Sequence, residues 1–257
     1  MAMIKLTPLF SGSSGNSTLI QTPRTNVLLD AGYAFKATVA RLAQSSVGLK
    51  DISAIVITHE HSDHVSALKC FAKYCNAKIF VPKNASNYVA QNCYCSNVEA
   101  IDGSFDIDDV FVENYRCSHD ARECFGYRFS EQNSVGCVTD TGIVNDELVN
   151  FLSPCETVFL ESNHDLEMLW HGPYPYVLKR RVASELGHLS NSQTAYVLDK
   201  LVGSKVKNVV LAHLSRQNNS KQAALTSAEQ ALTKHGVRVG KDVGLYVADQ
   251  FLNEVTI

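Results

Sequence analysis

The feature that most constrains this chain is a short apolar run that leads directly into a cluster of histidines and aspartates. Residues 52–58 read ISAIVIT, a β-branched run that is typical of a strand buried on both faces. His59, His61, Asp63 and His64 follow it immediately. Because the active sites of open α/β sheets lie at the carboxyl ends of strands, this order predicts an α/β fold with a polar site at the end of this strand.

The spacing of these side chains favours a metal site over a loop that is merely polar. In an extended segment, side chains two residues apart point to the same side, so His59 and His61 can reach one ion together. Asp63 and His64 come where a helical turn begins, and we expect them to be directed at a neighbouring point. Imidazole and carboxylate ligands suit Zn²⁺, Mn²⁺ and Fe²⁺.

Further apolar runs predict the other strands and helices. We expect strands at residues 4–10, 18–22, 26–30, 78–81, 110–117, 125–131, 134–139, 157–161, 208–212 and 244–248. We expect helices at residues 35–42, 67–74, 145–152, 192–202 and 223–235. Strands come first in meanders and then alternate with helices, which predicts two sheets between helical layers. No repeat or long linker marks a boundary, so we expect a single domain over residues 1–257.

Composition excludes several classes of protein. The 45% share of hydrophobic residues is enough for a real core, and the net charge of −3 argues against a polycation that binds nucleic acid by charge alone. The chain turns polar too soon after its start for a signal peptide, and no apolar stretch approaches the roughly 20 residues of a membrane helix. Eight cysteines show no zinc-ribbon spacing, so we expect reduced, mostly buried thiols in a cytoplasmic protein.

The motif HEHSDH at residues 59–64 resembles the HxHxDH signature of the metallo-β-lactamase superfamily, whose fold is a four-layer αββα sandwich. That fold agrees with the layers expected above. Several further motifs resemble the YycJ/WalJ group of this superfamily, which belongs with its phosphodiesterases and nucleases. They are SGSSGNS at 11–17, DAG at 30–32, ESNHD at 161–165, GPYP at 172–175, GHLSN at 187–191 and AHLS at 212–215.

The resemblance implies a centre with two divalent metal ions. His119, Asp140 and His213 match the remaining ligands of the superfamily, and each follows an apolar run. The implied ligand sets are His59, His61 and His119 for one ion and Asp63, His64 and His213 for the other, with Asp140 bridging. Two such ions at a distance of about 3.5–4 Å can clamp the attacking and leaving oxygens of a displacement. In this scheme Asp63 also has a catalytic role, because it helps to hold the attacking water.

His188 occupies the place where related phosphodiesterases carry a histidine that faces the scissile phosphate. Its imidazole could donate a proton to the leaving oxygen. The alternative is a structural or helix-capping histidine, but Asn191 is the better candidate for the cap of the following helix. His164 competes for the ligand or acid role, and we expect it to support the site rather than act in it. We expect Glu161 to orient a neighbouring histidine.

Three other segments have two interpretations each. Lys179, Arg180 and Arg181 could follow a phosphate backbone, although such a run is usually a solvated helix face. Tyr174 and Tyr176 could stack on bases or simply pack the loop. The glycine-serine loop at residues 11–17 could hold an anion, although a turn between strands is more common.

These observations lead to one preferred function and two alternatives. The preferred one, which the resemblance to the YycJ/WalJ group implies, is a cytoplasmic dinuclear metallohydrolase with DNA as its partner, acting as a 5′-to-3′ exonuclease. Without a second clamping domain, its grip on DNA would come from loops or from assembly into a homo-oligomer. The first alternative is hydrolysis of a small thioester, lactone or cyclic phosphate. The second is a metal-stabilised regulatory partner without activity, which the full ligand set disfavours.

Overall fold

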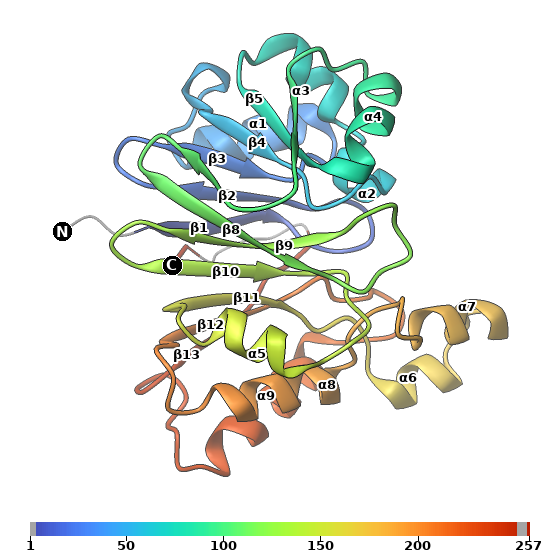
Figure 1. Cartoon of the computed structure of the whole chain (residues 1–257). Coiled ribbons are helices and arrows are strands. Elements are labelled where there is room, and N and C mark those ends of the chain that lie inside the picture. The colour runs from blue at the N-terminus through green and yellow to red at the C-terminus, as the bar shows by residue number, and fades with distance from the viewer. Residues whose placement is uncertain (1–3, 251–255) are drawn as a thin grey trace.

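Two β-sheets stacked face to face organise the chain, and helices cover the outer side of each sheet (Figure 1). The computed structural model describes residues 4–250, 256 and 257. Val56 and Phe80 of the first sheet and Phe129 and Phe159 of the second are buried in the core between the sheets. This arrangement confirms the expected four-layer αββα sandwich.

The first sheet has six strands in the order of the chain. They are β1 (Lys5–Phe10), β2 (Ser17–Gln21), β3 (Asn26–Leu29), β4 (Ala54–Val56), β5 (Lys78–Pro82) and β6 (Val98–Ile101). Strands β1 to β3 are antiparallel, and β3 to β6 are parallel. All three residues of β4 are buried, as the sequence predicts, but this strand is shorter than the expected 52–58.

The second sheet has seven strands in the order β13-β12-β11-β10-β9-β8-β7. They are β7 (Phe105–Ile107), β8 (Val110–Arg116), β9 (Phe125–Ser130), β10 (Ser134–Val138), β11 (Thr157–Glu161), β12 (Asn208–Ala212) and β13 (Gly244–Val247). Strands β7 to β10 are antiparallel, and β10 to β13 are parallel. The sequence prediction missed β6 and β7, since both are short and carry exposed polar residues.

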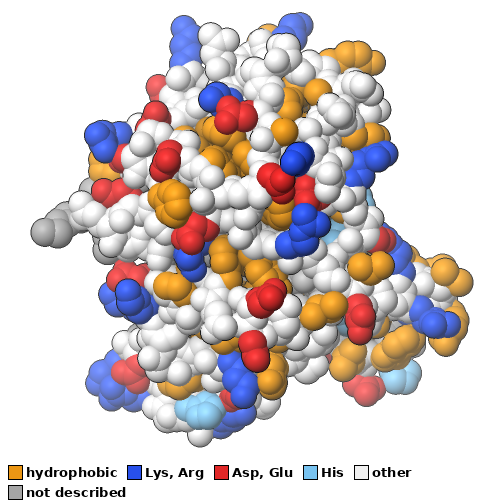
Figure 2. All heavy atoms as spheres, viewed as in Figure 1, with side chains coloured by type: hydrophobic (Ala, Val, Ile, Leu, Met, Phe, Trp, Pro, Cys, Tyr) orange, Lys and Arg blue, Asp and Glu red, His pale blue; other side chains and the backbone are white. Residues whose placement is uncertain are grey.

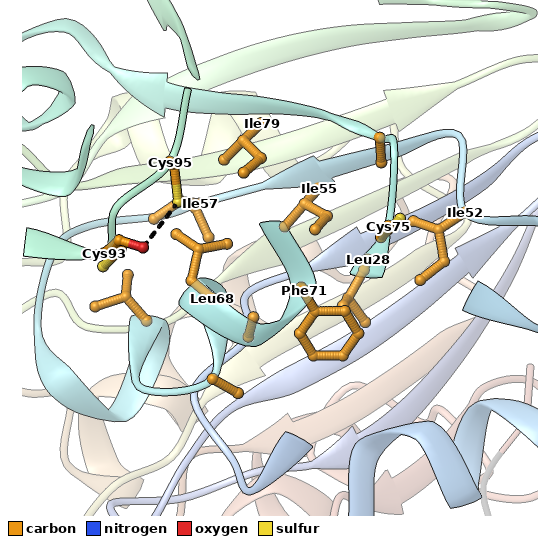
Figure 3. Close-up of a cluster of buried hydrophobic side chains, with 14 of the residues drawn as sticks. Leu28, Ile52, Ile55, Ile57, Leu68, Phe71, Cys75, Ile79, Cys93 and Cys95 are labelled. Atoms are coloured by element: carbon orange, nitrogen blue, oxygen red, sulfur yellow. Dashed lines mark hydrogen bonds between the residues drawn. The ribbon is translucent and has the colours of Figure 1, made fainter. Parts of the chain in front are cut away.

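Helices form the two outer layers. The first sheet is covered by α1 (Phe35–Gln44), α3 (Leu68–Tyr74) and α4 (Lys83–Asn92), and the second by α5 (Asp146–Leu152), α8 (Asn191–Leu201) and α9 (Lys221–Thr233). Shorter helices are α2 (Ser62–Val65), α6 (Leu166–His171), α7 (Tyr176–Val182) and a 3₁₀ turn at Leu49–Asp51. In Figure 3, Leu68 and Phe71 of α3 lie over Ile55 and Ile79 of the sheet. The sequence prediction missed α4 because this helix is polar and buries few side chains.

All eight cysteines lie in the described part of the chain, and each is free, as expected. Seven are buried and Cys70 is partly exposed. Cys93 and Cys95 belong to the same core and lie beside Leu68 (Figure 3), where burial raises the pKa of Cys95 to about 12. Within the described residues, no helix has the length and apolar character that crossing a membrane requires.

Close backbone contacts hold the histidine-rich segment at residues 59–64, which follows β4 and enters α2, in place. The amide of Ala31 donates to the His64 carbonyl at 2.9 Å, and the amide of Asn16 donates to the Asp63 carbonyl at 2.7 Å. Gly32 fits against the same segment, since a Cβ at this position would lie 1.7 Å from the Asp63 carbonyl oxygen. The DAG motif therefore has a steric reason, which is the close approach of its glycine to the histidine-rich loop.

We expect Gly32→Ala to destabilise the protein by about 2–3 kcal/mol and to weaken metal binding, because the added methyl group displaces the backbone of the loop. Gly103→Ala is the matched control, since a Cβ there meets no atom within 4 Å. Urea unfolding of both variants measures the effect. Equal stability of the two variants would contradict the steric argument.

Candidate metal centre

Loops that follow four strands bring the predicted ligands together. His59, His61, Asp63 and His64 follow β4, and His119 follows β8. His213 comes directly after β12, and Asp140 comes two residues after the end of β10. Among the described residues, potential ligand atoms gather in four groups, each with its atoms within 4.8 Å of one another. Two of these groups are the predicted sets: His59, His61 and His119 form one, and Asp63, His64 and His213 form the other. The other two are His59, His64 and Asp140, and Asp140, Glu161, His188 and His213.

Asp140 lies between the two groups. One of its carboxylate oxygens is 3.3 Å from His64 Nε2, and the other is 3.9 Å from His119 Nε2. It also forms a cluster of potential ligands with His59 and His64, which belong to different groups. A carboxylate in this position can contact a cation in either group.

Unpartnered buried atoms test whether these residues fit a metal. His59 Nε2, His213 Nε2 and Asp140 Oδ2 are buried and have no hydrogen-bond partner in the structure. Leaving a buried polar atom unpaired costs about 1–3 kcal/mol, so three of them at one site need an explanation. A bound cation is a suitable partner for all three atoms, and the donor set of imidazoles and carboxylates fits a divalent metal.

Asp30 and Thr58 orient two of the histidines. The His64 Nδ1–H donates to Asp30 Oδ2 at 2.8 Å, and the Thr58 hydroxyl donates to the same carboxylate at 3.0 Å. His59 Nδ1 lies 3.0 Å from the Thr58 hydroxyl oxygen. Because the Nδ1 atoms are engaged in this way, the Nε2 atoms of both rings face the centre. Asn16 of the glycine-serine loop also contacts the centre, with its amide 3.0 Å from His64 Nε2.

Glu161 orients two more histidines from the other sheet. Its buried carboxylate accepts hydrogen bonds from His213 Nδ1 at 2.9 Å and from His188 Nδ1 at 2.8 Å. The amides of Thr141 and Leu189 donate to its second oxygen. Glu161 therefore contacts two histidine rings in the way that the sequence analysis expects for one.

The loop with His119 is tied to the segment after α7. His119 Nδ1 donates to the Gly187 carbonyl at 3.1 Å. Its neighbour Asp120 accepts two hydrogen bonds from the Arg181 guanidinium, at 2.5 and 3.0 Å. Arg181 therefore fixes the position of a predicted ligand loop.

The carboxylates of the centre change the protonation of its histidines. Burial alone lowers the pKa of His213, but Asp140, Asp63 and Glu161 together raise it to about 10. In contrast, burial and the neighbouring His64 hold the pKa of His59 well below its ordinary value, so its ring stays neutral. The centre attracts positive charge at His213 and offers a neutral imidazole at His59, and both properties suit a metal site.

Three site residues have left-handed backbone conformations. Asp30, Asp140 and His213 have φ angles of 59°, 58° and 55°. Such angles are uncommon outside glycine, and they persist where the surrounding structure holds them. Asp30 and His213 follow directly on the ends of β3 and β12, and Asp140 comes two residues after β10. At each position the sharp change in backbone direction turns the side chain toward the centre.

A cleft of about 220 Å³ opens onto the groups of potential metal ligands. Its lining includes His61, Asp63 and His119 from the loops and His188 beside them. His188 is 15% exposed at its side chain, so a molecule in the cleft can contact the ring that Glu161 holds. The predicted acid thus lies at the cleft beside the metal groups.

The remaining predicted residues lie in different places. Arg181 lines the cleft, whereas Lys179 donates to the Trp170 carbonyl at 2.8 Å and Arg180 is exposed. His164 is buried next to the centre but belongs to none of the groups of potential ligand atoms among the described residues. Of the basic run, only Arg181 is brought to the cleft.

Besides Asn16, the glycine-serine loop supports the centre through Ser11 and borders the cleft with Ser13. Ser11 Oγ accepts a hydrogen bond from the His213 amide at 2.8 Å, and Ser13 lines the cleft. Tyr174 lines the cleft as well, while Tyr176 is 67% exposed.

One sequence interpretation is wrong. The N-cap of α8 is Ser190, whose side chain accepts from the Gln193 amide in a capping box, and Asn191 is the first residue of the helix. The Asn191 side chain instead bonds to Ser162 and Asn219 in the interior. A serine with a glutamine three residues later is a known cap signal that identifies Ser190.

Sequence reasoning also missed the supporting roles of Asp30 and Thr58. Asp30 entered only as part of a motif, although it follows an apolar strand just as Asp140 does. That shared signal could have identified it. The role of Thr58 depends on the contact between β3 and β4, which sequence spacing does not reveal.

Comparison with known proteins gives consistent results. The sequence model described as "Beta-lactamase superfamily domain" matches residues 25–214. The exodeoxyribonuclease YycJ of Bacillus anthracis is 35% identical over 250 residues, 94% of each chain. The exodeoxyribonuclease WalJ of Streptococcus pneumoniae is 34% identical over 250 residues, 94% of this chain and 93% of that protein. The metallo-β-lactamase fold protein YhfI of Bacillus subtilis superposes with a TM-score of 0.75 at 14% identity, covering 97% of this chain and 98% of that one.

We expect Asp30→Asn to weaken Zn²⁺ binding by about 10- to 100-fold, because the neutral amide orients His64 less strongly. Competition with a chromophoric chelator measures the affinity. Asp102→Asn is the control, since Asp102 is an exposed carboxylate that pairs with Lys83. An affinity of the Asp30 variant equal to that of the control would show that the hydrogen bond does not support the site.

We expect His164 to make the metal-free protein less stable in acid. Burial lowers its pKa to about 4, whereas an unfolded histidine titrates near 6.5, so the unfolded state gains a proton first as the pH falls. This difference removes about 3 kcal/mol of stability between pH 6.5 and 4. Urea unfolding of His164→Gln at several pH values should show a flatter dependence. The exposed His235→Gln variant should follow the unmodified protein, and a parallel curve for His164→Gln would refute the assignment.

Proposed function

The chain belongs to the β-lactamase superfamily and within it to the group of the YycJ and WalJ exodeoxyribonucleases, and on this premise we propose that it is a metal-dependent exonuclease that degrades DNA in the 5′-to-3′ direction. One observation carries the proposal. Asp140, with an unpartnered buried oxygen, lies between two groups of histidine and aspartate side chains at a cleft. Such an arrangement suits two cations that share one carboxylate.

The proposed ligand sets are His59, His61 and His119 for one ion and Asp63, His64 and His213 for the other, with Asp140 between them. When bound, the ions supply Lewis acidity and stabilise the charge that develops on the phosphoryl oxygens. Zn²⁺ and Mn²⁺ both suit nitrogen and carboxylate ligands, and Fe²⁺ is a third candidate.

The protein's own residues perform the remaining tasks. Glu161 holds the His188 ring through Nδ1, which leaves Nε2 to act at the cleft. A water oxygen bonds to phosphorus and its proton passes to the solvent, the bond from phosphorus to the leaving oxygen breaks, and His188 gives that leaving oxygen a proton. Asp63 is proposed to position the attacking water. Arg181, at the wall of the cleft, supplies a positive charge toward the phosphate.

We also propose that the whole chain acts as a single domain, because both sheets contribute to one core and one centre. The cytoplasm is the proposed location, where eight free thiols stay reduced and DNA is accessible.

Removal of the metal and loss of its ligands should abolish cleavage. We expect a 5′-phosphorylated, end-labelled oligonucleotide to lose mononucleotides from its 5′ end, and a chelator to stop this reaction until Mn²⁺ or Zn²⁺ is added back. A variant with both His61→Ala and Asp140→Ala should be inactive, while His235→Ala on the surface should retain full activity. Residual cleavage by the double variant would exclude this centre as the site of the reaction.

Replacing His188 tests the proton donor separately. We expect His188→Gln to lower kcat by about 10²- to 10⁴-fold while its metal content stays unchanged. A substrate with a more acidic leaving group, such as bis(p-nitrophenyl) phosphate, should be much less sensitive to this substitution. If both substrates lose the same factor, His188 does not act as the acid. A thioester tested in parallel checks the alternative substrate class.

A further inference from the structure

Helices α6 and α7 expose an unusual number of apolar side chains beside the cleft. We refer to residues 165–187, which contain both helices, as the α6–α7 arm. Trp170 is 42% exposed, Tyr176 67% and Val177 80%. The rings of Trp170 and Tyr176 are neighbours, with centroids 6.4 Å apart. Figure 2 shows hydrophobic and charged side chains gathered where Figure 1 places these helices. Exposed aromatic clusters of this kind mark binding surfaces.

The arm continues the wall of the cleft. Tyr174, Leu178 and Arg181 line the cleft together with His61 and His188. A chain molecule whose phosphate lies at the metal groups therefore has the arm as its nearest neighbour on this side.

Several contacts hold the arm rigid. Lys179 Nζ of α7 donates to the Trp170 carbonyl of α6, which joins the two helices. At the turn between them, a Cβ on Gly172 would lie 2.6 Å from Asn218 Oδ1, so the glycine allows close packing against the body of the protein. The ion pair from Arg181 to Asp120 fixes the far end. An arm whose backbone is fixed in this way loses little conformational entropy when it binds a ligand.

The basic end of the arm indicates the kind of ligand. Lys179, Arg180 and Arg181 form the last turn of α7. Arg180 is exposed and has no ion-pair partner in residues 4–250, so its charge is available. Cationic side chains next to exposed aromatic rings suit a polyanion that carries flat rings, which is the chemistry of single-stranded nucleic acid.

We propose that the α6–α7 arm is a stacking platform for unpaired bases of the DNA strand next to the phosphate that is cleaved. Trp170 and Tyr176 stack on the bases, and Arg180 contacts the backbone phosphate. This inference rests on the proposed exonuclease function and adds that the substrate is unpaired at this point. In a duplex only the terminal pair has a free base face, whereas two stacking rings need more than one. The strand end must therefore be single-stranded or frayed where it meets the arm.

Trp170 is the single tryptophan of the chain, so its fluorescence reports directly on the arm. The metal-loaded full chain is titrated with a 5′-phosphorylated single strand that has phosphorothioate linkages and resists hydrolysis. We expect strong quenching, and little quenching by the same strand with abasic sites at its first positions. Tyr176→Ala should bind the intact strand about 10-fold more weakly, in line with the loss of one stacked base.

Matched variants separate stacking from a folding defect. We expect Trp170→Ala to weaken binding about 10-fold in fluorescence anisotropy with a labelled strand, and Trp170→Phe to restore most of the affinity. Tyr94→Ala is the control, since Tyr94 is 72% exposed beside Lys69 on the opposite helical layer. This variant should bind the strand with the affinity of the unmodified protein.

Three results would overturn the proposal. The first two are equal quenching by intact and abasic strands, and arm variants that bind the strand as tightly as the unmodified protein. The third is a lower molecular mass of the arm variants than of the unmodified protein in sedimentation, which would assign the surface to a second copy of the chain. Hydrolysis of bis(p-nitrophenyl) phosphate tests the centre without the arm. If this small ester and the oligonucleotide are both cleaved while the arm variants behave normally, the stacking proposal alone fails. If neither is cleaved while stacking is observed, the proposed function fails.

Discussion

Negative charge buried between two sheets is the constraint on which this site depends. Asp30, Asp140 and Glu161 are each at most 3% exposed, yet they lie in one region. Burying carboxylates costs several kcal/mol per group unless positive charge and hydrogen bonds compensate. The histidines supply part of this compensation, and His213 takes up a proton that its carboxylate neighbours stabilise. Three buried atoms, His59 Nε2, His213 Nε2 and Asp140 Oδ2, remain without a hydrogen-bond partner, and there bound cations would complete the compensation.

The fold meets this requirement by ending strands of both sheets at the same place. One sheet contributes the loop after β4, and the other contributes the loops after β8, β10 and β12. Each sheet also supplies a buried carboxylate behind the histidines: Asp30 for the first and Glu161 for the second. The centre therefore requires both sheets, because neither sheet alone supplies all of the predicted ligands. The core between them keeps the two halves of the centre in register.

The prediction from sequence was accurate where a strand runs straight into polar residues. The sequence predicts the strands before His59, Asp140 and His213, because a short apolar run that ends at a histidine or aspartate is a strong local signal. The prediction from sequence is wrong or incomplete where the sequence pattern is weak or where the feature depends on tertiary contacts. Helices α6 and α7 are short and were not anticipated, and the cap of α8 was assigned to Asn191 instead of Ser190. That these side chains bind metal stays a prediction, which their geometry now makes specific.

The sequence alone determined the kind of chemistry available to this protein, because residue type and spacing decide which atoms can bind a metal and which strands precede them. Only the tertiary structure decided the arrangement. Sequence cannot show that Glu161 contacts His188 and His213 at once, or that Arg181 reaches Asp120, since these partners lie 27 to 61 positions apart. Contacts over such separations depend on how the layers pack, and packing is a property of the whole chain.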